Sequence, residues 1–342
     1  MKKVWQMIFA IYMLTASAHA GVGNNISADT WVNSMYQKLT VAERIGQLID
    51  FRVEPTSENI VDIIDDITNN HVGSVTITGG DAEASVLLIN SLQEHMKVPV
   101  FVSADVQKSL NLPFASSTQL PKTSTFIKAN DSLLLSSGID QISGIYHKLG
   151  INGSLLSLHE MVISDDGLIL KSGFQDELPT YFQSINKQLQ QNQIVSNTDF
   201  HFRFSNDFVS SPKAMQSWNV STWKDKTSEL GQYWNSNNFS NSILTIKSLP
   251  EFPENEAVHF NKKIVNPLLW KYLQYGGVLS ADFDAIKKNQ YSNSHAEIVR
   301  SLIKIGSDKI VVSSDIDQVY AALMNGLDNR YFKQNEIKGK VK

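Results

Sequence analysis

The chain has 342 residues, 42% of them hydrophobic, and a formal net charge of −4. This mildly acidic balance argues against nucleic acid or an anionic membrane as the main partner, because neither attracts a negative surface. The chain contains no cysteine, which excludes disulfides and lipid attachment through a cysteine. The fold must therefore rest on its hydrophobic core, and this length is sufficient for one large barrel or two ordinary domains.

Residues 1–20 have the pattern of an export signal. Lys2 and Lys3 form a basic start, and Met7 to Leu14 form an apolar core that is shorter than the ~20 residues a membrane span needs. Ala18-His19-Ala20 is the small-x-small pattern that precedes signal cleavage. We therefore expect cleavage after Ala20, a periplasmic or secreted protein and no membrane span afterwards. The alternative for this segment is a buried N-terminal helix.

Short apolar runs of β-type alternate with longer amphipathic segments along the rest of the chain. Eight strands, each followed by a segment of helix length, predict a parallel sheet closed as a (β/α)8 barrel of TIM type, a single α/β domain over residues 21–342. A doubly wound open sheet gives a similar alternation, and the count of eight favours the barrel. The predicted strands are Gln47–Phe51, Ser74–Ile77, Pro99–Ala104, Ile151–Leu158, Ile194–Phe200, Ser242–Ile246, Gly277–Ala281 and Lys309–Ser313.

Helical spacing of apolar residues predicts helices at Asp131–Leu149 and Asp176–Gln191. Asp131 is a suitable N-cap for the first of them, and Gly150 is suitable directly after its last residue. Asp315 is the expected N-cap of the last long helix. The basic residues Lys338 to Lys342 are expected to form a frayed end.

Four segments, in chain order, carry a family resemblance. Trp31–Leu48 contains the signature L-T-x-x-E-[KR]-I-G-Q-L, which is the most specific match, and Val98–Asp105 reads VPVFVSAD. Leu120–Gly150 follows the course "LP…LGA…D…G…LGI", and Gly276–Phe283 reads GGVLSADF, similar to G-V-[IV]-x-[ST]-D-[DA]-[LF]. Together they resemble the N-terminal barrel of glycoside hydrolase family 3, most closely its β-N-acetylglucosaminidase branch.

The resemblance implies roles for residues at the ends of two strands. Asp105 corresponds to the aspartate that holds the sugar. Alignment on Gly277-Val278 and Ser280 puts Ala281 where the family has its nucleophilic aspartate. Asp282 is adjacent, but neighbouring strand residues point to opposite faces, so we expect Asp282 to point away from the cleft unless a bulge intervenes.

Two further segments depart from the family. The family's loop K-H-F-P-G-H-G, which carries a histidine acid/base over the sugar, corresponds to residues 200–206, and only His201 and the following phenylalanine remain. Asp207 is a candidate replacement acid. Lys171-Ser172 stands where the family has an Arg-Ser pair that grips the sugar, and a lysine does not reproduce the bidentate fork of arginine.

Each of these residues has an alternative structural role. Aspartates after strands often cap the next helix, which applies to Asp105 and Asp282. His201 is equally suited to a hydrogen-bonded place in the core, and Asp207 to a solvated loop. His147 and His159-Glu160 lack partners at metal-ligand spacing, so no metal site and no cofactor are expected.

Retaining glycosidases need a carboxylate nucleophile and a proton donor on either side of the glycosidic bond. With both family residues replaced, the leading hypothesis is a catalytically impaired relative that binds an amino-sugar-containing glycan or acts as a partner subunit. The first alternative is an active β-N-acetylhexosaminidase with relocated residues, for which Asp282, Asp207 and His201 are weak candidates. The second is a scaffold subunit of an envelope assembly.

Overall fold

The structure is a computed structural model. It describes residues 27–105, 114, 129, 131–164, 167–171, 178–204, 243–247, 257, 261–288 and 293–341. The predicted export signal at residues 1–20 lies outside this part of the chain.

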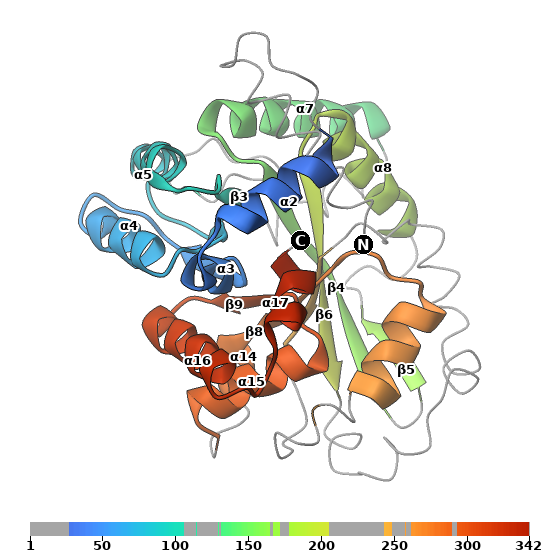
Figure 1. Cartoon of the computed structure of the whole chain (residues 1–342). Helices are drawn as coiled ribbons and strands as arrows, with labels where there is room; N and C mark the ends of the chain where they lie inside the picture. Colours follow the sequence, from blue (N-terminus) through green and yellow to red (C-terminus); the bar gives the residue numbers. More distant parts are fainter. Residues whose placement is uncertain are drawn as a thin grey trace.

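The fold is α/β, and the described strands form one curled sheet (Figure 1). Neighbouring strands run parallel, except at one edge of the sheet. The strand order is β3-β2-β1-β9-β8-β7-β6-β4-β5, and β3 also pairs with β4 in parallel. Such a sheet is typical of a TIM-like fold. The strands are β1 (Ile49–Val53), β2 (Ser74–Ile77), β3 (Phe101–Asp105), β4 (Gly153–Ser164), β5 (Gly167–Lys171), β6 (Val195–Phe204), β7 (Ile243–Ile246), β8 (Val278–Asp282) and β9 (Lys309–Val312).

Each of the eight predicted strands overlaps an observed one, which confirms the strand prediction along the chain. The difference lies after β4, which continues to Ser164 and returns as β5. These two strands form an antiparallel hairpin with Glu160 opposite Lys171. The hairpin was not predicted, because the apolar pattern of its second strand is short.

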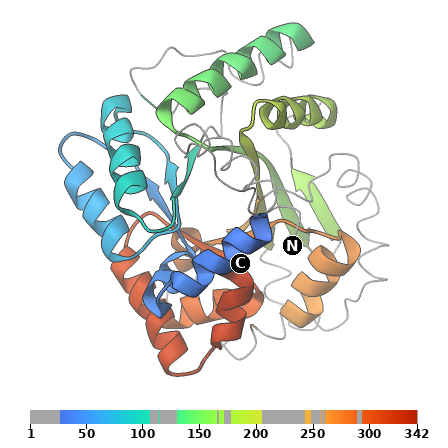
Figure 2. The ribbon, with the colours of Figure 1, turned by 45° about the horizontal axis from the view of Figure 1, so that its top comes forward.

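Helices lie on the outer side of the curled sheet, as both views show (Figures 1 and 2). Helices that follow neighbouring strands pack against each other, for example α7 with α8 and α15 with α16. The helices are α2 (Ala28–Lys38), α3 (Val41–Gly46), α4 (Ile60–Asn69), α5 (Ala82–His95), α7 (Ser132–Leu149), α8 (Leu178–Gln191), the π-helix η2 (Asn261–Tyr272), α14 (Phe283–Lys287), α15 (His295–Ile305), α16 (Ile316–Asp328) and α17 (Gln334–Val341).

The predicted ends of α7 are confirmed. The carboxylate of Asp131 accepts hydrogen bonds from the backbone N–H groups of Leu133 and Leu134, and Gly150 follows the helix with φ 78°. Asp315 is the N-cap residue of α16, as predicted, but it lies at φ 57° and its side chain makes no cap hydrogen bond. Its carboxylate is instead bound by Lys287, 2.6 Å away.

The two faces of the sheet have opposite chemistry, because successive residues of a strand point to opposite sides. On β1, β2, β3, β7, β8 and β9, one alternating set of apolar residues joins helix residues such as Ile67, Leu88 and Leu302 in one buried cluster, so this set points outward toward the helices. The alternate residues therefore define an inner face, which is largely polar. Its buried members include Asp50, Ser74, Thr76, Ser103, Thr245, Ser280 and Asp282.

Candidate functional site

Charged side chains gather at the carboxyl ends of the parallel strands, the edge at which folds of this kind carry their chemistry. Asp105 is the last residue of β3 and Asp282 the last residue of β8. Arg52 lies one residue before the end of β1. Strands far apart in the sequence thus bring these three residues to one edge.

Ala281 lies in the apolar layer between the sheet and its helices. It is 0% exposed, and its register partners Ile246 and Ile310 belong to the same buried cluster. Residues opposite each other on paired strands share a face of the sheet, so Ala281 points outward. The structure therefore differs from the expectation that Ala281 faces the cleft.

Asp282 points to the inner face instead. It stands in register with Val311 of β9, which is in register with Asp50 of β1. Arg52 Nη1 donates a hydrogen bond of 2.8 Å to Asp282 Oδ2, across the intervening strand β9. The backbone N–H of Ala285 donates one of 2.9 Å to Oδ1, which caps α14. Both carboxylate oxygens are thus engaged, and the side chain is 7% exposed.

A polar network fills the inner face on β1, β2 and β3. Thr76 Oγ1 donates to Asp50 Oδ1 at 2.9 Å and lies 2.9 Å from Ser103 Oγ. Lys309 Nζ donates to Ser74 Oγ at 2.6 Å. Burial lowers the pKa of the Lys309 ammonium, and the carboxylates of Asp50 and Asp308 counteract this effect. The interior is consequently held together by hydrogen bonds rather than by apolar packing alone.

The loop after β9 is tied to α14, next to Asp282. Asp284 accepts hydrogen bonds from the N–H of Ser313 at 2.7 Å and from its hydroxyl at 2.6 Å. Lys287 of the same helix binds Asp315. The Lys287 ammonium holds the pKa of the Asp315 carboxyl below its ordinary value. Contacts of Asp284 with Ser313 and of Lys287 with Asp315 therefore hold α14, the helix after Asp282, against the segment that follows β9.

Asp105 is half-buried and stands in register with Leu155 of β4. Its charge acts on Tyr146, a fully buried residue of α7. Burial raises the pKa of the Tyr146 phenol, and the negative charge of Asp105 raises it further.

Of the other predicted site residues, the structure brings two to neighbouring positions by their backbone. Lys171 of β5 and His201 of β6 are both in register with Glu160 of β4, one on either side. His201 is also in register with Thr245 of β7. Ser172 and Asp207 lie outside the described residues. Glu160 was missed as a neighbour of this pair, because only the unpredicted hairpin places Lys171 beside it.

Within the described part of the chain, no group of three or more His, Asp or Glu side chains is arranged to hold a metal ion. A search of the same residues for membrane spans finds no helix with the length and apolar character to cross a bilayer.

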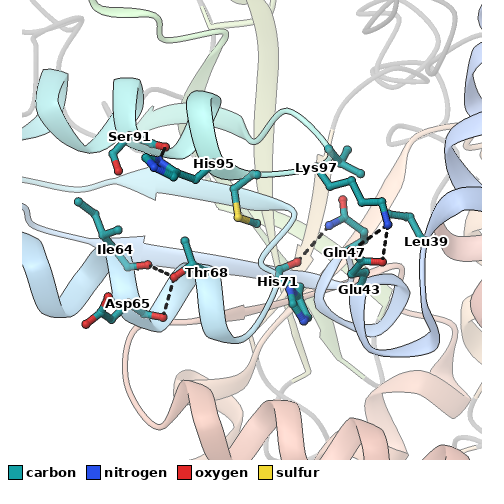
Figure 3. Close-up of a pocket in the computed structure, with 12 residues that line it drawn as sticks. Leu39, Glu43, Gln47, Ile64, Asp65, Thr68, His71, Ser91, His95 and Lys97 are labelled. Carbon is teal, nitrogen blue, oxygen red and sulfur yellow. Dashed lines mark hydrogen bonds and ion pairs between the residues drawn. The ribbon is translucent and has the colours of Figure 1, made fainter.

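A cavity of about 480 Å³ lies at the opposite edge of the sheet, among α3, α4 and α5 (Figure 3). Several of its polar groups already bind each other: Gln47 Nε2 donates to the carbonyl of His71 at 3.0 Å, and Lys97 Nζ lies 3.1 Å from Glu43 Oε1. None of the residues predicted for the site lines it. We therefore place the candidate site at the carboxyl ends of the strands.

No family model matches the sequence, and no curated protein matches it significantly. Solved structures do match. A β-glucoside phosphorylase, BglX, bound to 2FGlc is 11% identical with a TM-score of 0.65, over 93% of this chain and 60% of that one. A glycoside hydrolase family 3 β-N-acetylglucosaminidase from Paenibacillus sp. str. FPU-7 is 16% identical with a TM-score of 0.60, over 89% of this chain and 61% of that one.

A β-N-acetylhexosaminidase from Beutenbergia cavernae DSM 12333 is 17% identical with a TM-score of 0.59, over 89% of this chain and 96% of that one. The chain thus spans about 60% of the length of the first two proteins and nearly all of the third. Identities this low establish likeness of fold and nothing further. Over about 90% of its length, the chain has the fold of the N-terminal domains of glycoside hydrolase family 3.

Proposed function

We propose that this chain is an exported protein that binds an amino-sugar-containing glycan at the carboxyl ends of its parallel strands, with impaired hydrolysis. The observation that carries the proposal is the position and the hydrogen bonding of Asp282, the inner-face carboxylate at the end of β8. Arg52 and the N-terminus of α14 bind its two oxygens. The glycosidases of similar fold, two of which are named for N-acetylated amino sugars, support the ligand class.

The register supports an alignment shifted by one residue from that based on Ser280. The family signature has its aspartate five positions after its glycine, and counting from Gly277 this position is Asp282. Asp282 points to the inner face, whereas Ala281 is buried under the helices. We therefore assign the place of the family nucleophile to Asp282.

Impairment follows from two features. Both oxygens of Asp282 accept a hydrogen bond within the protein, one of them from the charged Arg52, and this stabilisation of the negative charge makes the carboxylate a weaker nucleophile. The family's histidine-bearing loop is replaced by Arg203-Phe204-Ser205-Asn206, which contains no proton donor of that kind. Loss of a positioned proton donor alone lowers the rate by about 10²–10⁴-fold.

The same proposal includes a complete eight-stranded barrel over residues 21–342 after removal of the signal at residues 1–20. The pairing of β3 with β4, from Ser103 opposite Gly153 to Asp105 opposite Leu155, supports closure of the ring. Closure matters for function, because it would bring Asp105 and Asp282 to a common rim.

The experiment is calorimetric titration of the protein with N-acetylglucosamine, together with an assay on a chromogenic N-acetylglucosaminide. We expect saturable binding and turnover at the level of buffer. Asp105→Ala should weaken binding at least about tenfold, since a charged hydrogen bond contributes about 1.5–3 kcal/mol. Asp65→Ala, at the opposite edge of the sheet, is the matched control. Absence of binding, or equal loss in both variants, contradicts the proposal.

A second candidate function is retaining β-N-acetylhexosaminidase activity. The observation that favours it is the inner-face position of Asp282 at the end of a strand, the place of a family nucleophile. Turnover of the chromogenic substrate that disappears in Asp282→Asn would establish this function and reject impairment.

A further inference from the structure

Arg52 and Asp282 are 230 residues apart in the sequence, yet they form an ion pair at the carboxyl ends of β1 and β8. The Nη1–Oδ2 distance is 2.8 Å, and the side chains are 17% and 7% exposed. In such a partly buried place, an ion pair is little screened by salt and persists. Arg52 is the more exposed of the two side chains.

The second oxygen of Asp282 is held independently. Its bond with the N–H of Ala285 fixes the carboxylate to the start of α14, and Phe283 in that helix is 0% exposed. The carboxylate therefore cannot turn away from Arg52 without releasing the helix cap. The hydrogen bond leaves Oδ2 a second lone pair, but the guanidinium stabilises the negative charge of the carboxylate and so lowers the nucleophilicity of Oδ2 toward a sugar.

From this geometry we propose that Arg52 is an autoinhibitory clamp, a positioning residue that withholds the Asp282 carboxylate from reaction. The inference rests on the proposed function, because it takes the sugar site to lie at this edge of the sheet. It goes further by naming one residue of β1 as a cause of impairment that is separate from the altered histidine loop.

The clamp is tested with a substrate that needs no proton donor, 2,4-dinitrophenyl N-acetyl-β-glucosaminide. An oxygen of Asp282 attacks the anomeric carbon and forms an ester bond. The bond from that carbon to the aryl oxygen breaks, and dinitrophenolate leaves with the electron pair as a stable anion. The reaction yields one dinitrophenolate and one glycosyl-aspartyl adduct per protein, which absorbance and intact-protein mass spectrometry measure.

The full chain is compared with Arg52→Met, Arg52→Lys and Asp282→Asn. We expect slow labelling of the wild-type protein and labelling about 100-fold faster in Arg52→Met, which keeps an unbranched side chain but removes its charge and its hydrogen-bond donors. Arg52→Lys keeps the charge and should stay near the wild-type rate, an outcome that a merely structural role of Arg52 does not produce. Asp282→Asn, alone or combined with Arg52→Met, should give no adduct.

Equal labelling rates in wild-type protein and a folded Arg52→Met variant overturn the clamp. If Arg52→Met does not fold, Arg52→Gln takes its place, and rapid adduct formation on Asp282 of the wild-type protein overturns the clamp without any variant. Sugar binding is measured separately by calorimetry. Binding without faster labelling rejects the clamp alone, whereas absence of binding in every protein rejects the proposed function as well.

Discussion

Lys340 Nζ donates a hydrogen bond of 2.6 Å to the carbonyl oxygen of Ser307, which joins the C-terminal helix α17 to the loop before β9. The same ammonium lies 3.7 Å from Asp308, and the lysine side chain is 11% exposed. The expectation of a frayed basic end at residues 338–342 is therefore wrong for the part of it that α17 includes. Lys340 therefore holds α17 against the segment that precedes β9.

Lys340→Met should lower the free energy of unfolding by about 1–3 kcal/mol, because it leaves the buried carbonyl of Ser307 without this partner and weakens the pairing of Asp308. Lys338, on the same helix, is exposed, and Lys338→Met should change the stability by no more than about 0.5 kcal/mol. Urea unfolding of both variants gives the comparison. Equal effects would mean that the Lys340 contact contributes nothing.

A pH dependence is expected from Asp315. Hydrogen bonding to Lys287, with a smaller contribution from His295, lowers the pKa of this carboxyl in the folded protein below 3.8. The ion pair therefore stabilises the fold above about pH 4, and this contribution is lost as the pH falls through the lower folded-state pKa. The stability difference between wild type and Asp315→Asn should shrink as the pH falls below about 4. Asparagine tolerates the φ of 57° at this position, so the backbone is not the cause of the difference. A difference that grows at low pH would contradict the assignment.

Ala281→Asp should now be strongly destabilising, by several kcal/mol, because the residue is 0% exposed within the apolar cluster. The alignment based on Ser280 gives the opposite expectation, a tolerated carboxylate at an open rim. Leu133→Asp is the control, since Leu133 is 81% exposed and should tolerate the charge. Thermal unfolding of the two variants decides between the two placements.

The alternation of helix-facing and inner-facing residues along each strand explains which features of the fold could be predicted from the sequence alone. Apolar runs predicted every strand that takes part in the parallel pairing, because those residues cover the helix-facing side. The inner face could not be predicted in this way. Its residues Asp50, Thr76 and Ser103 look like isolated polar interruptions until the register brings them within hydrogen-bonding distance. Ala281 was misplaced for a related reason: a one-residue shift in alignment exchanges the two faces of a strand.

The contact of Arg52 with Asp282 had no signal in the sequence, since it depends on strands from both ends of the chain. The family resemblance located the segment around Asp282 but not its partner. Lys171 and His201 were predicted from two separate segments of the family resemblance. Only the structure shows that both residues are in register with Glu160 of β4, one on either side.

Thr76→Val tests the inner network. Valine keeps the shape of threonine but removes the hydroxyl that binds Asp50 and lies beside Ser103, so we expect a loss of about 1–3 kcal/mol in unfolding free energy. Thr78, just beyond the same strand, is partly exposed and makes longer contacts of 3.3 and 3.4 Å. Thr78→Val should be nearly neutral. A larger effect at Thr78 would locate the critical hydroxyl outside the interior.

The last prediction concerns Gly46, the glycine of the I-G-Q-L signature. At the end of α3, a Cβ at this position would collide with the backbone carbonyls of Asn70 and His71, which precede β2. These are backbone atoms, and the N–H of Gly73 also binds the carbonyl of Gly46, so the two segments cannot separate without breaking a hydrogen bond. Gly46→Ala should therefore lower the free energy of unfolding by about 1–3 kcal/mol, as overpacking does.

Gly144 is the matched control, since it lies within α7 and a Cβ added there would meet no atom within 4 Å. Gly144→Ala should stabilise the protein by about 0.5–1 kcal/mol through helix propensity. Opposite signs for the two substitutions in urea unfolding are the expected result, and a neutral Gly46→Ala would mean that α3 does not pack this closely against the segment before β2.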